Sequence, residues 1–225
     1  MSLRDKSSEV RAALEALARK ERSEAILAAE GVPINAGLPL IEAEPGVPER
    51  NSEDVAHRAM ALIVVAMRAE RMAQQLAARI IAEYGLEPYL TPLEQAFLRR
   101  PLPSEKDTQR FSWRYESAWL LLWALGFEET AGRPDRPCDV ARVVASMRDR
   151  RADQFIDAAK MRPMTQILEE ADLVYRYHWA VVDARMKQQS PPAGLHPGVL
   201  YERHYALNWL IGYCDQEWDE VTTDT

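Results

Sequence analysis

Apolar residues recur every three or four positions along most of the chain, and no convincing alternation of apolar and polar residues marks a strand. This periodicity predicts helices over residues 7–30, 52–84, 91–99, 113–125, 139–147, 153–161, 163–188 and 197–214. The sequence therefore predicts an all-α protein, a multi-helix bundle of about eight helices.

Local residues mark several helix ends. Gly31 suits the left-handed position that follows a helix, and Gly85 is placed to stop the helix over 52–84. Ser52 and Ser112 are suitable N-caps, because a hydroxyl accepts a hydrogen bond from a free amide of the first turn. The stretch Thr91-Pro92-Leu93-Glu94 predicts a capping box.

We expect residues 1–225 to form a single helical unit. Pro33, Pro39, Pro45 and Pro48 fall within one short stretch, which predicts an extended, proline-rich connector. The unit then consists of an N-terminal docking helix (7–30), this connector (31–51), a helical core (52–215) and an acidic tail (216–225), with Trp218 anchoring the tail.

Two of the predicted helices carry apolar stripes of different strength. Residues Val10, Leu14, Leu17 and Ala25 form a thin stripe on the first helix, which we expect to dock through it. An alanine-rich seam from Val55 to Ile80 suits close packing against another helix.

Composition excludes several classes of protein. The 225 residues are 47% hydrophobic and 28% charged, which argues against disorder. A net charge of −7 opposes binding to nucleic acid or anionic lipid, so we expect neither as a partner. The most apolar run, Ala118–Gly126, is too short to cross a bilayer, and the N-terminus lacks a signal-peptide pattern. Two cysteines outside any CxxC motif suit a soluble cytoplasmic protein with reduced thiols.

Polar residues interrupt three helices that are hydrophobic on most faces, 113–125, 163–188 and 197–214, which should therefore be central. Such residues need partners, because an isolated charge in a core is costly. The candidate cluster consists of Arg114, Glu116, Asp172, Arg176, His178, Glu202, Arg203, His204 and Asn208.

Three interpretations of this cluster remain open. The residues form a paired network that fixes the register of three helices, or they converge on a ligand pocket, or several of them are exposed. Arg176 can reach Asp172, four residues earlier, or point outward.

The sequence contains no strong motif of a familiar metal or catalytic site. Candidate metal ligands such as Asp172 and His178 are spaced off one helix face, so we expect no metal and no cofactor. No Gly-rich phosphate loop or Gly-x-Ser-x-Gly elbow exists. Cys138 precedes a helix start, which would favour its thiolate, although an inert thiol is the simpler interpretation. The tryptophans fall on apolar helices, which indicates core packing.

Short motifs are spread along nearly the whole chain. They are Arg19–Ser23, Gly31–Asn35 with Leu38-Pro39, Glu53–Leu62, Leu90–Glu94, Phe111–Glu116, Leu122–Gly126, Met161–Pro163, Asp172–Trp179, Glu202–Trp209, Trp218–Val221 and Thr223–Thr225. Together these segments resemble the DUF4272 family, bacterial proteins named as a domain of unknown function. The resemblance implies one folding unit that includes the connector, and it supplies no substrate, cofactor or catalytic residue.

Two functional hypotheses follow. The first is a non-enzymatic interaction or scaffold protein that buries the 55–80 seam or the first helix on a protein partner or a second copy. The alternative is a binding protein or enzyme for a small ligand, with the ligand anionic because arginines are abundant in the polar cluster. The sequence names no reaction.

Overall fold

The computed structural model describes residues 3–42 and 49–225, with side chains in the first helix described from Val10 onward. Within these ranges the chain forms ten α-helices and four short 3-10 helices, and no strand, which confirms the all-α prediction. The α-helices are α1 (Leu3–Glu30), α2 (Ser52–Ala69), α3 (Gln74–Glu83), α4 (Pro92–Leu98), α5 (Glu105–Ser112), α6 (Arg114–Ala124), α7 (Val140–Arg148), α8 (Ala152–Ala158), α9 (Met164–Met186) and α10 (Pro197–Leu210).

Two differences account for the helices beyond the predicted eight. The prediction of one continuous helix over 52–84 is wrong, because this stretch forms two helices, α2 and α3. The chain turns between them at Arg71, which has a left-handed φ of 71°. The Arg68 side chain holds this turn by donating to the Met72 carbonyl at 3.1 Å and the Arg100 carbonyl at 2.9 Å. The prediction of Ser112 as an N-cap is also wrong, because Ser112 is the last residue of an additional helix, α5, which Ser104 caps.

Several predicted helix ends are confirmed. Gly31 follows α1 directly with a φ of 70°, Gly85 follows the C-cap of α3 with a φ of 64°, and the Thr91–Glu94 capping box is present. The cap of α2 lies one residue earlier than predicted, at Asn51, whose side chain accepts from the Asp54 amide at 2.8 Å.

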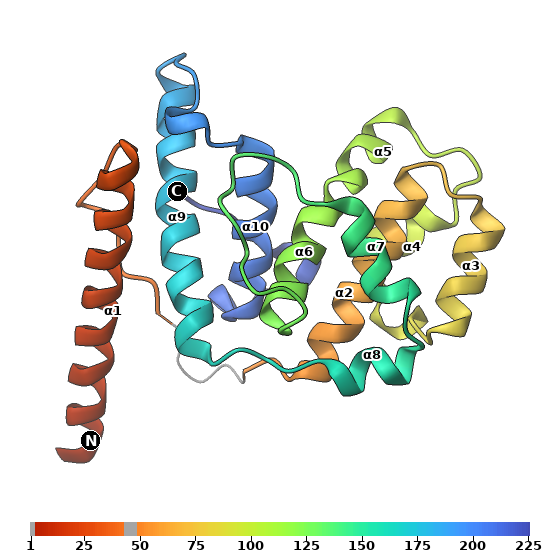
Figure 1. Cartoon of the computed structure of the whole chain (residues 1–225), viewed down its shortest axis with the longest axis horizontal. Coiled ribbons are helices and arrows are strands. Elements are labelled where there is room, and N and C mark those ends of the chain that lie inside the picture. The colour runs from red at the N-terminus through yellow and green to blue at the C-terminus, as the bar shows by residue number, and fades with distance from the viewer. Residues whose placement is uncertain (1–2, 43–48) are drawn as a thin grey trace.

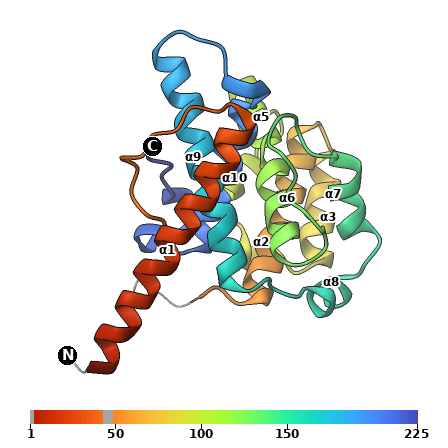
Figure 2. The ribbon, with the colours of Figure 1, turned by 60° about the vertical axis from the view of Figure 1, so that its left-hand side comes forward.

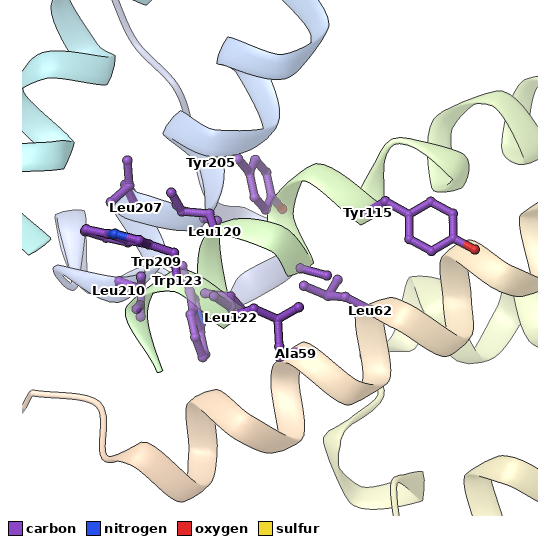
Figure 3. Close-up of a cluster of buried hydrophobic side chains, with 14 of the residues drawn as sticks. Ala59, Leu62, Tyr115, Leu120, Leu122, Trp123, Tyr205, Leu207, Trp209 and Leu210 are labelled. Carbon is purple, nitrogen blue, oxygen red and sulfur yellow. The ribbon is translucent and has the colours of Figure 1, made fainter. Parts of the chain in front are cut away.

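Helix α2 lies at the centre of the fold, with α6 against it and α10 beyond (Figure 1). Every residue from Val55 to Ala66 is buried, so most of the predicted seam packs within this chain and is not open to a partner. Figure 3 shows the cluster formed by Ala59 and Leu62 of α2, Leu120 and Leu122 of α6, and Leu207 and Leu210 of α10.

Helix α1 packs along α9 at one edge of the molecule, and its N-terminal part extends past the body in Figures 1 and 2. The predicted docking stripe is wrong. Val10 and Leu14 are 60% and 61% exposed, whereas the docked face carries Ala16, Arg19, Ser23 and Leu27. The inner face contains two polar residues, which is why hydrophobicity alone selected the outer one.

The packing of α1 predicts that truncating two of its leucines lowers the free energy of unfolding by different amounts. Leu27→Ala should lower the free energy of unfolding by about 2–5 kcal/mol, because Leu27 is 1% exposed and leaves a cavity. Leu14→Ala is the matched control and should cost less than about 0.5 kcal/mol. Urea unfolding measures both, and equal costs would contradict the docked orientation of α1.

Cations hold the part of the connector that the structure describes. Lys20 donates to the Leu38 carbonyl at 2.9 Å, and Arg19 donates to the Ile41 carbonyl at 2.6 Å. These carbonyls have no helix or sheet partner, so side chains satisfy them instead. Pro45 and Pro48 of the predicted connector lie outside the described residues.

The C-terminal segment packs back on the body. Trp218 is 3% exposed and lies against the rings of Tyr205 and Trp209, which confirms its predicted role as an anchor. Among the helices the structure describes, none is long and apolar enough to span a bilayer.

Candidate functional site

Arg114 begins α6 and pairs with α10. Its Nη1 donates to Glu202 Oε2 at 3.0 Å, and Ser117 Oγ donates to the same oxygen at 2.6 Å. The guanidinium also lies over the Tyr205 ring, 4.7 Å from its centroid. This network joins α6 to α10 and leaves Glu202 Oε1 without a hydrogen bond from any described residue.

Arg203 forms a second network between the same two helices, α6 and α10. Its Nε donates to Glu116 Oε2 at 3.4 Å, and its Nη1 donates to the Gly132 carbonyl at 2.6 Å. Glu116 Oε1 accepts from the Cys138 amide. Burial and the nearby Glu116 carboxylate raise the pKa of Cys138, which keeps the thiol protonated and agrees with the simpler interpretation of an inert thiol.

Asp172 and Arg176 form a third network between α9 and the N-terminal segment. Two hydrogen bonds of 2.8 Å join the carboxylate of Asp172, which is 0% exposed, to the guanidinium. Arg176 also donates to the Pro39 carbonyl at 3.3 Å and lies 3.6 Å from Glu24. Arg176 therefore points inward. Asn208 is separate from these networks and donates to the Thr222 carbonyl at 2.8 Å, which ties α10 to the tail.

The two histidines of the cluster form a pair between α9 and α10. Their Nδ1 atoms are 2.9 Å apart, and their rings meet edge to face. Burial lowers the pKa of His178 to about 4, with the Arg185 charge contributing, and lowers that of His204 to about 3, with His178 contributing. Both rings are therefore neutral at pH 7, and one Nδ1 carries the shared proton while the other accepts it.

This pair predicts a loss of stability in acid. Between pH 6.5 and about 4, the histidines take up protons in the unfolded chain but stay neutral in the folded one. Stability is therefore greatest above pH 6.5 and falls with decreasing pH, by up to about 1.4 kcal/mol per pH unit for each histidine. Urea unfolding across this range should show a shallower slope in the His178→Leu/His204→Leu variant, and an unchanged slope would contradict the assignment.

His178 also lines a cleft between the C-terminal half of α9 and the first turns of α10. Residues 187–196 connect these two helices at the upper end of the molecule in Figure 1. The cleft has a volume of about 640 Å³. Apolar atoms make up most of its wall, including Trp113, Val181 and Tyr201. Its lining also contains Arg110, Val182, Arg185, Gln188, Gln189, Pro191, Pro197, Gly198 and Glu202.

The depth of the cleft separates its polar groups. His178 and Glu202 are 6% and 4% exposed and form its floor, whereas Arg110 and Arg185 are exposed and lie at its rim. The indole of Trp113 packs against Gly198, where an added Cβ would come within 2.7 Å of it. Glycine at this position lets the indole form one wall of the cleft.

Of the nine predicted cluster residues, the cleft brings together only His178 and Glu202. Arg114, Glu116, Asp172, Arg176 and Arg203 lie in the paired networks described above, with His204 behind His178 and Asn208 at the tail. The sequence interpretation missed Arg110, Arg185 and Tyr201, and it placed Trp113 in the core. These residues come from three helices and a cap, so no local motif could have grouped them.

The described part of the chain contains no group of three or more His, Cys, Asp or Glu side chains that could hold a metal ion. No curated protein and no solved structure shows significant similarity to the chain. Residues 19–221 match the family described as "Domain of unknown function (DUF4272)". The match covers nearly the whole sequence, and the chain belongs to the DUF4272 family.

Proposed function

We propose that this protein binds a small organic anion in the cleft between α9 and α10. The observation that carries the proposal is the pair of rim arginines, Arg110 and Arg185. Neither forms an ion pair or a hydrogen bond with a described residue, although most other arginines of the chain are paired. Two cations beside an apolar cleft favour a ligand that carries a carboxylate or a phosphate.

The cleft also has the size and surface of a ligand site. A volume of about 640 Å³ lies within the range of roughly 300–1,000 Å³ that is usual for small-molecule pockets. Trp113 and Tyr201 offer aromatic surface for an apolar body. The N-terminus of α10 at Pro197 and Gly198 adds a favourable dipole for a negative group.

Charge balance inside the cleft supports the same class of ligand. Among the described residues of the lining, Glu202 is the one carboxylate. Its charge is neutralised by Arg114, which does not line the cleft and whose Nη1 lies 3.0 Å from Glu202 Oε2. The uncompensated charge of the lining is therefore positive, although the protein as a whole has a net charge of −7.

A thermal-shift screen of small carboxylates, phosphates and amines, followed by calorimetric titration, tests the proposal. The Arg110→Gln/Arg185→Gln variant should lose affinity for the anions by more than about tenfold. The Arg99→Gln/Arg148→Gln variant is the control, because these arginines are 71% and 68% exposed elsewhere and their loss changes the net charge equally. Binding of amines alone, or equal losses in both variants, would contradict the proposal.

A second candidate function is an interaction protein, supported by the exposed stripe on α1. Val10, Leu14 and Leu17 are each at least 45% exposed on the side away from α9. A second copy is the partner we propose for this stripe, because a two-fold axis would bring the same surface of both copies together. Light scattering tests this, since a strict monomer unchanged by Leu14→Glu would exclude it. We propose a bacterial cytoplasmic location for either function.

A further inference from the structure

The floor of the cleft leaves two polar atoms without partners. Among the described residues, no donor reaches Glu202 Oε1, because Arg114 and Ser117 both bind Oε2. No group pairs with His178 Nε2, because the hydrogen bond to His204 uses Nδ1. Both residues are more than nine-tenths buried and line the cleft. Neither atom is itself fully buried, so a ligand in the cleft can reach both of them and replace water as their partner.

From this arrangement we infer that the bound anion carries a hydroxyl group at the end opposite its acid, so that the ligand class is a hydroxylated organic acid. The inference rests on the proposed function. The acid lies at the rim beside Arg110 and Arg185, and the hydroxyl reaches the floor between Glu202 and His178.

The floor favours an uncharged group over an ammonium. Arg114 and Glu202 cancel each other's charge, and the histidine pair is neutral. An ammonium at this depth would lie near the Arg114 guanidinium with no carboxylate of its own, which is costly. A hydroxyl carries no charge and both donates and accepts.

The hydroxyl also determines which histidine atoms carry protons. It donates to Glu202 Oε1, because an ionised carboxylate only accepts, and so it must accept from His178 Nε2. A neutral imidazole has one N–H, so His178 Nδ1 then accepts the hydrogen bond from His204 Nδ1. The expected tautomers are therefore Nε2–H for His178 and Nδ1–H for His204.

Two probes that differ by one hydroxyl test the inference. In calorimetric titrations, 4-hydroxyphenylacetate should bind more tightly than phenylacetate by at least about tenfold, because only the hydroxylated acid pairs with both polar atoms of the floor. In the His178→Leu variant this ratio should fall towards one, because leucine removes the donor to the hydroxyl and keeps an apolar surface.

The outcomes separate the two proposals. Equal affinities for the probes, or a preference for phenylacetate, overturn the hydroxyl inference and leave anion binding intact. Binding of neither probe at millimolar concentration overturns both. If His178→Leu does not fold, imidazole ¹⁵N shifts of the wild type complexed with 4-hydroxyphenylacetate decide the matter, because an Nδ1–H tautomer of His178 contradicts the inference.

Discussion

Replacing Arg176 by methionine should lower the free energy of unfolding by about 3–5 kcal/mol. The substitution leaves the Asp172 carboxylate, which is 0% exposed, without its two hydrogen bonds of 2.8 Å. It also frees the Pro39 carbonyl of the connector. Urea unfolding at pH 7 measures the loss.

Helix α9 supplies a matched control. Lys187 pairs with Asp183 at 2.7 Å with the same four-residue spacing, but the lysine is 59% exposed. Lys187→Met should therefore cost less than about 1 kcal/mol. Replacing both members of the buried pair, as in Asp172→Leu/Arg176→Met, should cost less than Arg176→Met alone, because no carboxylate is then stranded. Similar costs for Arg176→Met and Lys187→Met would contradict the buried network.

Arg203→Met should destabilise the fold by about 3 kcal/mol or more. Methionine keeps much of the volume of the side chain but removes the partner of Glu116, which is 2% exposed. The change also releases the Gly132 carbonyl, which Arg203 holds at 2.6 Å.

The exposed Arg136, which pairs with Asp135, provides the control for this second substitution, because it lies in the same loop as Gly132. Arg136 is 83% exposed, so Arg136→Met should change stability by less than about 0.5 kcal/mol. If Arg203→Met were as stable as the wild type, Arg203 would not be part of a structural network, and its charge would be retained for another reason.

The fold class and most helix ends could be predicted from the sequence because their causes are local. The Thr91–Glu94 capping box and the glycines after α1 and α3 are determined within a single turn of chain. The turn after α2 could not be predicted, because apolar spacing continues through Ala69 and Ala73 and the Arg68 contacts that hold the turn come from residues 72–101.

The candidate site was less predictable than the fold. His178 and Glu202 stand out in the sequence as polar residues on apolar helices, but the sequence does not separate residues of the paired networks from those of the cleft. Exposed residues such as Arg110 and Arg185 look like ordinary surface arginines in a sequence. Their role depends on the packing of α5, α9 and α10, which no local pattern encodes.

The histidine rings offer the most direct test of ligand binding in the cleft. The chain has four histidines, so their ¹H–¹⁵N correlations are few. Titration with phenylacetate should move the ring signals of His178, which lines the cleft. It should leave those of His57 in place, because His57 does not line the cleft and stacks instead on Tyr89, with 3.8 Å between ring centroids. Unmoved His178 signals under a saturating anion would contradict the proposed site.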